Sequence, residues 1–256
     1  MIKEMYEISP KNFDIISLDL FNTLVYVDRS SFDLYSHMEK ALLKFPNIQQ
    51  QLPDISLDDI ITAYYSAVRR KIHNKETEKE FRNDLILFEV LRQYNEEMSS
   101  SELSSLATEI VRVYFELALP LIHPFPGLIK TLDYLKEEEY TLVLTSNHSW
   151  APNGWDVIRK YDLNSYFNQI TFSGDLGWRK PSPKVFSAAI SGLSYRSKQH
   201  VIHVGDEIVA DILGALTFGI KALWVCSSQK ESEKGKIKEF DVHNTISNIT
   251  ELPQHL

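Results

Sequence analysis

Near its amino terminus the chain contains the stretch Phe13-Asp-Ile-Ile-Ser-Leu-Asp19, which decides the fold. Short runs of β-branched and other apolar residues are typical of strands that are buried on both faces of a parallel sheet. The stretch ends in an acidic residue, and open parallel sheets bind their ligands at the carboxyl ends of the strands. We therefore predict a buried strand with a functional carboxylate, Asp19, at its end.

The second half of the chain supplies the neighbours that a parallel sheet needs. Apolar runs typical of strands alternate there with segments of helical periodicity. The predicted strands are 140–145, 169–172, 200–204 and 221–225, and the predicted helices are 128–139, 155–160, 183–193 and 210–218. Strands that alternate with helices form right-handed crossovers and hence a parallel sheet. The predicted fold class is α/β.

The region between these two parts has a different character. From about residue 30 to residue 119, apolar residues recur at helical spacing, over 32–45, 57–73, 77–94 and 101–118. The proline-rich segment Pro120 to Gly127 then leads back to the alternating pattern. We predict an α/β core formed by residues 1–27 and 122–256, which is interrupted by a helical domain over residues 28–121.

Composition limits the classes of partner. The chain has 256 residues, enough for a core and a smaller inserted domain, and its formal net charge is -8. Nucleic acids and anionic membrane surfaces attract clustered Lys and Arg, so we expect neither as a partner. The first residues do not resemble a secretory signal, and no apolar run approaches the ~20 residues of a membrane-spanning helix. A cytoplasmic protein is expected.

Several polar residues follow the predicted strands or begin the elements after them. They are Asp19, Ser146, Asn147, Lys180, Asp206 and Asp211. Converging carboxylates repel one another unless a cation lies among them. Ligands that are all oxygen favour a hard ion such as Mg²⁺. The pattern therefore predicts a site for a hard cation at the edge of the sheet.

Four of these segments resemble, in the correct order, the motifs of the haloacid dehalogenase superfamily. They are Asp19-Leu-Phe-Asn-Thr23, Leu144-Thr-Ser-Asn147, Trp178-Arg-Lys-Pro-Ser-Pro183 and Val204-Gly-Asp-Glu-Ile-Val-Ala-Asp211. Pro124-Phe-Pro-Gly127 is similar to the family's return into the core after a helical cap. The resemblance covers essentially the whole chain, and it implies a Rossmann-like parallel-sheet core with an inserted α-helical cap.

The resemblance also implies an activity, that of a Mg²⁺-dependent phosphohydrolase acting on a small phosphorylated metabolite. Asp19 would be the nucleophile that forms an aspartyl-phosphate, which splits one difficult displacement into two easier ones. Lys180 would be catalytic, because it would neutralise charge on the nucleophile and on the phosphoryl group. The cap would cover the site and choose the substrate.

Further roles are implied for the other motif residues. Ser146 and Asn147 would bind the substrate, and backbone N–H groups of the following helix start would help to hold the phosphoryl group. The metal ligands would be Asp19, Asp206, Asp211 and the backbone carbonyl of Phe21. Asp211 would act mostly through water or by orienting Lys180.

One position departs from the family's phosphatases, which usually have a second Asp two residues after the nucleophile. Here that residue is Phe21, which cannot transfer a proton. General acid–base catalysis typically contributes ~10²–10⁴ in rate, so poor leaving groups should react slowly and acyl or aryl phosphates less so. Asn22 tolerates a tight turn rather than replacing the acid. His148, the cap or the substrate could supply the proton.

Three functions remain open at this point: phosphohydrolase, non-catalytic binder of a phosphorylated ligand or protein, and metal-independent 2-haloacid dehalogenase. Phe21 favours the dehalogenase, since an aromatic residue at this position is found in that branch. Asp206 with Asp211 counts against it, because a metal beside the nucleophile would obstruct attack on carbon. The sequence favours the phosphohydrolase and determines neither the physiological substrate nor the oligomeric state.

Overall fold

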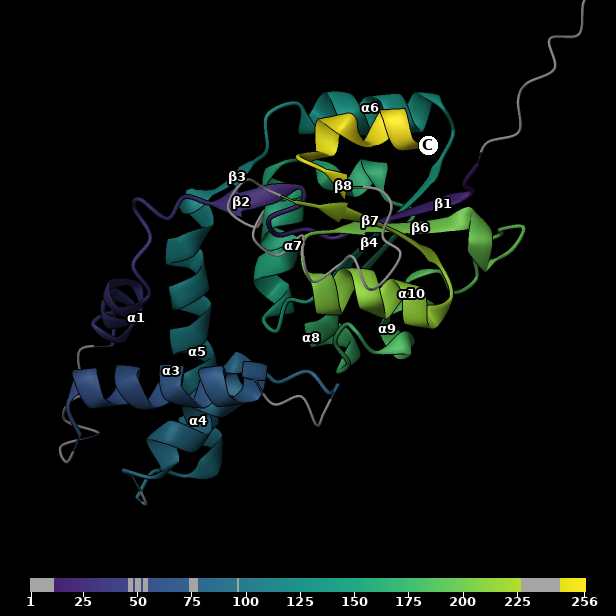
Figure 1. Cartoon of the computed structure of the whole chain (residues 1–256). Coiled ribbons are helices and arrows are strands. Elements are labelled where there is room, and N and C mark those ends of the chain that lie inside the picture. Colours follow the sequence, from purple (N-terminus) through teal and green to yellow (C-terminus); the bar gives the residue numbers. More distant parts are fainter. Residues whose placement is uncertain are drawn as a thin grey trace, which may run out of the picture.

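The computed structural model describes residues 12–45, 48, 52, 55–73, 78–95, 97–226 and 245–256. Within these residues, parallel strands form a sheet in the order β5-β4-β1-β6-β7-β8. The strands are β1 (Ile15–Leu18), β4 (Thr141–Ser146), β5 (Gln169–Phe172), β6 (Val201–Gly205), β7 (Lys221–Val225) and β8 (Thr245–Ile246). β1 lies between β4 and β6, inside the sheet (Figure 1). The predicted α/β class is confirmed.

Helices cover both faces of this sheet because alternate residues of each strand point to opposite sides. Ile16 and Leu18 pack in one buried cluster with residues of α6 (Leu128–Glu137), α7 (Ala151–Lys160) and the C-terminal 3-10 helix Ile249–His255. Ile15 packs in another cluster with residues of α9 (Pro183–Ala189) and α10 (Gly214–Phe218). In Figure 1, α6 lies above the sheet, and α9 and α10 lie below it.

Short helical segments fill several connections between the longer helices and strands. They are the 3-10 helices Leu119–Leu121, Leu163–Tyr166 and Lys198–His200, the short helix α8 (Ser173–Leu176) and the π-helix Ile208–Leu213. The π-helix leads directly into α10, where the sequence predicts a helix over 210–218. π-helical turns are rare and occur frequently at functional sites.

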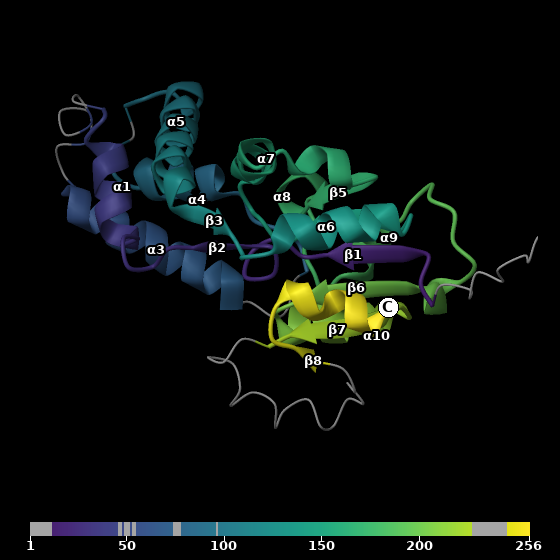
Figure 2. The same cartoon turned by 90° about the horizontal axis from the view of Figure 1, so that it is seen from above.

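The helical insertion lies to one side of the sheet (Figure 2). It contains α1 (Leu34–Leu42), α3 (Leu57–His73), α4 (Asn83–Arg92) and α5 (Ser100–Ala118). The antiparallel pair β2 (Val25–Val27) and β3 (Ile122–Pro124) connects it to the core at both ends. Its helices share a buried apolar cluster that includes Met38, Leu87 and Ile110 and also takes in Trp150 from the core.

One predicted helix in the insertion is too long. The periodicity predicts a helix over 77–94, but α4 begins at Asn83, and Glu78 to Glu80 are not helical; Thr77 lies outside the described residues. The backbone of this segment is bonded to another part of the chain: Glu80 N–H donates to Gly177 O (3.0 Å), and Arg179 N–H donates to Glu78 O (2.9 Å). Tertiary hydrogen bonds have replaced those that a helix would form here.

Two further predictions concern the turn after β1 and membrane-spanning helices. Asn22 has a φ of 59°, in the left-handed region, so the tight turn predicted after β1 is confirmed. None of the helices in the described ranges is both long enough and apolar enough to span a membrane.

Candidate active site at the carboxyl edge of the sheet

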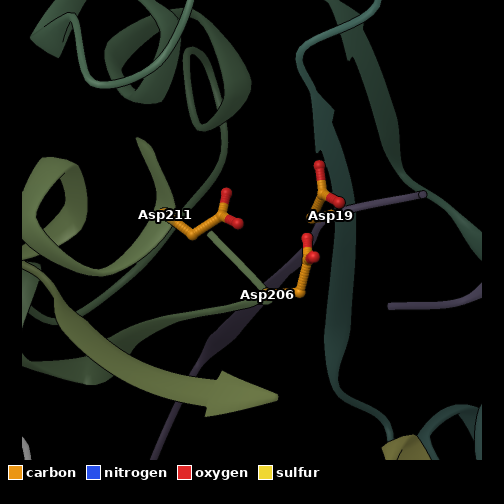
Figure 3. A group of neighbouring side chains, drawn as sticks. All are labelled: Asp19, Asp206 and Asp211. Carbon is orange, nitrogen blue, oxygen red and sulfur yellow. The ribbon is translucent and has the colours of Figure 1, made fainter. Parts of the chain in front are cut away.

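Three carboxylates meet at the carboxyl ends of the two central strands. Asp19 follows β1, Asp206 follows β6, and Asp211 lies in the π-helix after it. One oxygen of each lies within 4.8 Å of the corresponding oxygens of the other two, and all three residues are buried (Figure 3). The group can hold a metal ion because each residue offers one oxygen to a common space.

Close approach of the carboxylates depends on Gly205. A Cβ atom on Gly205 would lie 2.6 Å from Asp211 Cβ and closer still to the Asp211 carboxyl group. Any larger residue would therefore push Asp211 away from the strand end. Steric contact with Asp211 therefore explains why the fourth motif has a glycine at position 205.

Lys180 lies among these carboxylates with its side chain buried. Its Nζ donates to Asp19 Oδ1 (2.8 Å) and to the carbonyl oxygen of Thr145 (2.6 Å), and it lies 2.5 Å from Asp211 Oδ1. An ammonium group has three N–H donors, and three oxygens are in place to accept them. Lys180 thus joins the nucleophile candidate to Asp211 and to the end of β4.

The charges shift the ionisation of these groups. Burial raises the pKa of Asp19 to about 7; Asp211 and Asp206 also raise it, and Lys180 opposes the rise. Burial alone would raise the pKa of Asp211 too, but Lys180 and a hydrogen bond from His203 outweigh it and hold that pKa low. Burial lowers the pKa of Lys180, whereas Asp19 and Asp211 raise it by more. Burial and the two neighbouring carboxylates therefore disfavour the ionised form of Asp19, and a cation bound beside it would favour that form.

Asn147 holds the loop that contains Lys180. Its Nδ2 donates to the carbonyl oxygen of Lys180 (2.9 Å), and its Oδ1 accepts from the Lys180 backbone N–H (2.7 Å). The predicted role of Asn147 was contact with substrate, but this pair of bonds directs its amide to the protein backbone. The neighbouring Ser146 differs: its Oγ is buried and has no hydrogen-bond partner among the described residues.

Phe21 and His148 lie in contact beside the nucleophile candidate, with ring centroids 4.9 Å apart. Burial lowers the pKa of His148 to about 4, and a hydrogen bond with Asn153 only partly opposes this. The ring is therefore neutral near pH 7 and has no proton to give as an imidazolium. His148 is therefore a poor candidate among the proton sources that the sequence leaves open.

Residues from the helical insertion contact the same loops. The side chain of Glu80 is 3% exposed; its Oε2 accepts from Ser173 Oγ–H, and its Oε1 lies 3.9 Å from Arg179 Nη1. The Ser173 oxygen in turn accepts from the His148 backbone N–H (2.7 Å). The contact thus joins the insertion to the loops on either side of the candidate site.

Two residues of the candidate site, His203 and Glu80, were not predicted from the sequence. His203, on β6, lies 3.0 Å from Asp211 Oδ1 through its Nε2, and burial and the nearby Lys180 lower its pKa, so its ring is neutral. A histidine inside an apolar strand is a signal that could have revealed it. Glu80 has no such signal, because its burial depends on a contact with residues about a hundred positions away.

Comparisons with known proteins agree with this geometry. Residues 56–225 match a family model described as haloacid dehalogenase-like hydrolase. The glyceraldehyde 3-phosphate phosphatase of Pyrococcus furiosus is 31% identical over 57% of this chain and 58% of its own length. That of Methanothermobacter thermautotrophicus is 28% identical over 56% of this chain and 63% of its own length. The chain thus spans less than two thirds of the length of these curated relatives.

A solved structure extends the comparison of folds. The 2-haloacid dehalogenase of Pseudomonas syringae pv. Tomato superposes with a TM-score of 0.65 over 94% of this chain and 97% of its own, at 24% sequence identity. That likeness includes the helical insertion as well as the sheet and concerns the fold alone. With the family model matching residues 56–225 and the acidic cluster at the sheet edge, the chain belongs to the haloacid dehalogenase-like hydrolases.

Proposed function

We propose that the chain is a Mg²⁺-dependent phosphohydrolase that uses Asp19 as a covalent nucleophile on a small phosphorylated metabolite. The observation that supports this most is the buried group Asp19, Asp206 and Asp211, with Lys180 bonded to the first and last of them. The relatives named as phosphatases of a small phosphorylated sugar support the same class of substrate. The acidic net charge supports an enzyme without nucleic-acid or membrane-surface partners, and we propose a cytoplasmic location.

The donor set fits Mg²⁺. Asp19, Asp206 and the backbone carbonyl of Phe21 would hold the ion directly, and Asp211, whose Oδ2 accepts from Glu207 N–H (2.8 Å), would act mainly by orienting Lys180. Bound there, Mg²⁺ would neutralise the carboxylates and the charge on the phosphoryl oxygens. The raised pKa of Asp19 supports the assignment, because burial first and the nearby Asp211 and Asp206 second disfavour its ionised form, which a bound cation would favour.

The reaction would run in two displacements. An oxygen of Asp19 attacks phosphorus, a new P–O bond forms, and the bond to the leaving oxygen breaks with its electron pair. Water then attacks the phosphorus of the aspartyl-phosphate, releases phosphate and restores Asp19. Ser146 would donate its hydroxyl, which has no partner among the described residues, to a phosphoryl oxygen. Asn147 would act by holding Lys180 in place.

Phe21 restricts the leaving group. It cannot protonate a departing alkoxide, and the neutral His148 beside it is a poor substitute at pH 7. The leaving groups of acyl and aryl phosphates depart without that help, so these compounds should be better substrates than alkyl phosphates.

We propose that the helical segment 28–121 acts as the cap over the core formed by 1–27 and 122–256.

Replacement of Asp19 is the direct test. Purified protein with Mg²⁺ should hydrolyse acetyl phosphate and p-nitrophenyl phosphate, and Asp19→Asn or EDTA should remove the activity. Asp58→Asn is a matched control, since Asp58 is an exposed carboxylate on α3. Turnover that survives Asp19→Asn would exclude the nucleophile and with it the proposed mechanism.

The same preparation tests both alternatives. Phe21 is the observation that favours them, because it is compatible with a dehalogenase and with a binder that does not turn over. Chloride released from a 2-haloacid without added metal would support the dehalogenase. Binding of Mg²⁺ and phosphate by calorimetry, together with no turnover over a broad panel of phosphate esters and acyl phosphates, would support the binder.

A further inference from the structure

A line of buried polar side chains runs behind the carboxylates, inside an otherwise apolar face of the sheet. Ser17 on β1, Thr145 on β4 and His203 on β6 are each at most 1% exposed. They point to the same side as Ile15 and Val143, which pack against α9 and α10. Buried polar groups are costly unless they are hydrogen-bonded, so three of them at this place require an explanation.

These side chains form a continuous chain of hydrogen bonds. Ser17 Oγ lies 2.8 Å from Thr145 Oγ1 and 2.8 Å from His203 Nδ1. On the other side of the imidazole ring, His203 Nε2 lies 3.0 Å from Asp211 Oδ1. The Phe186 ring packs edge-on against the imidazole, with centroids 5.2 Å apart.

The direction of every bond follows from the acceptor at one end. An ionised carboxylate can only accept, so the hydrogen of the neutral ring lies on Nε2 and is donated to Asp211. Nδ1 is then an acceptor, and the Ser17 hydroxyl must donate to it. Ser17 has used its single hydrogen, so the Thr145 hydroxyl donates to Ser17 Oγ. Each ring nitrogen then has one role, whereas the Ser17 hydroxyl donates to one partner and accepts from the other.

The chain of bonds closes on itself through Lys180. Lys180 Nζ lies 2.5 Å from Asp211 Oδ1 and donates to the backbone oxygen of Thr145 at 2.6 Å. Strand β4 therefore holds both ends, through the side chain and the backbone of the same residue. The third donor of Lys180 reaches Asp19 Oδ1 (2.8 Å), the proposed nucleophile.

We propose that His203 is a positioning residue, fixed by Ser17 and Thr145, that orients the Asp211 carboxylate and through it the Lys180 ammonium on Asp19. This inference rests on the proposed function and deepens it. His203 and Lys180 at Oδ1 and Glu207 N–H at Oδ2 together give the Asp211 carboxylate three donors. Removal of the ring donor leaves Asp211 with two donors in place of three, so its carboxylate, and with it the Lys180 ammonium, is held less firmly.

The variants are His203→Leu, which removes both ring nitrogens, and His203→Gln, whose amide N–H can still donate to Asp211. Val201→Ala is the matched control, because Val201 is fully buried on the same strand and face and packs in the neighbouring apolar cluster. Loss of a hydrogen bond to a metal-site ligand typically costs 10–100-fold. We expect His203→Leu to lower kcat on p-nitrophenyl phosphate by about 10- to 100-fold with KM changed little, and His203→Gln to recover most of it.

The second readout is independent of turnover. Nitrogen NMR of the wild-type ring should show hydrogen on Nε2 and a bare Nδ1, and the Lys180 ammonium signal should move in His203→Leu but not in Val201→Ala. Equal kcat in His203→Leu and Val201→Ala, an unmoved Lys180 signal, or hydrogen on Nδ1 would each overturn the proposal. If His203→Leu does not fold, Ser17→Ala replaces it and should shift the Nδ1 signal and lower kcat by a smaller factor.

Failure of this inference can be told apart from failure of the proposed function. Wild-type protein that hydrolyses no phosphorylated compound would reject the phosphohydrolase. The Nε2 tautomer and the shifted Lys180 signal would then still support the positioning network. Normal wild-type turnover with an unresponsive Lys180 signal would reject the network and leave the phosphohydrolase standing.

Discussion

Removal of the Glu80 carboxylate should loosen the contact between the helical insertion and the loop that contains Lys180. Glu80 accepts from the Ser173 hydroxyl and lies 3.9 Å from an Arg179 nitrogen, with its side chain 3% exposed. Lys180 directly follows Arg179, so any displacement of this contact reaches the candidate site. Glu80→Ala removes both interactions and the hydrogen bond that Phe81 N–H donates to Glu80 Oε1 (2.9 Å), and Glu80→Gln keeps the volume and an acceptor but removes the charge.

The size of the effect follows mainly from the interactions of Glu80 with Ser173 and Arg179, which lie on another part of the chain. A buried hydrogen bond to a charged group contributes ~1.5–3 kcal/mol. The Arg179 pair adds less than about 1 kcal/mol, because Arg179 is partly exposed and the two atoms are 3.9 Å apart. Two backbone hydrogen bonds, Glu80 N–H to Gly177 O and Arg179 N–H to Glu78 O, remain in the variants. We expect a loss of about 2 kcal/mol for Glu80→Ala and about 1 kcal/mol for Glu80→Gln.

Those energies correspond to factors of about 30 and about 5 in the equilibrium between the docked and undocked segment. Hydrogen exchange of the Glu80 and Arg179 amides reports that equilibrium directly, and kcat/KM on p-nitrophenyl phosphate should fall by no more than the same factors. Glu78→Gln is the control, since the side chain of Glu78 is exposed while its backbone oxygen makes one of the two retained bonds. If Glu80→Ala exchanges and turns over like Glu78→Gln, the buried carboxylate does not hold this contact.

Three further changes have defined outcomes. Phe21→Asp should raise kcat on alkyl phosphates by more than on aryl phosphates, up to the ~10²–10⁴ of general acid–base catalysis, and equal gains on both would contradict the assignment of the missing proton. Gly205→Ala should weaken Mg²⁺ binding measured by calorimetry by about tenfold or more, because its Cβ would overlap the Asp211 carboxyl group. Ser99→Ala should lower the free energy of unfolding in urea by about 1 kcal/mol without changing kcat, since Ser99 and Glu102 form the capping box of α5; a change in kcat would contradict its purely structural role.

Much of the fold could be predicted from local patterns. The strands 141–146 and 201–205 lie within one residue of their predicted positions, because apolar runs bounded by polar residues report burial directly. The left-handed Asn22 and the helix start at Leu57, where Ser56 Oγ accepts from Asp59 N–H, follow from chemistry between residues a few positions apart. The meeting of Asp19 with Asp206 also follows, because neighbouring parallel strands end at the same edge.

The partners of those carboxylates depend on contacts between distant segments. Asn147 bonds to the Lys180 backbone, and Glu80 joins loops from the core, so neither arrangement is visible in a local pattern. The segment before α4 is a further example of a contact between distant segments. Its periodicity favours a helix, but its N–H and C=O groups pair with residues 177 and 179 instead.

The sequence by itself determined the α/β class, the presence of helices between the first strand and the rest of the sheet, and the carboxylates at the sheet edge. Only the tertiary structure decided that Ser17, Thr145 and His203 meet, since they lie on three strands and are separated by at least 58 residues along the chain. Their contact requires the register of β1 with β4 and β6, in which Ser17 pairs with His203. A slip of one residue would turn each side chain to the opposite face, because side chains alternate along a strand.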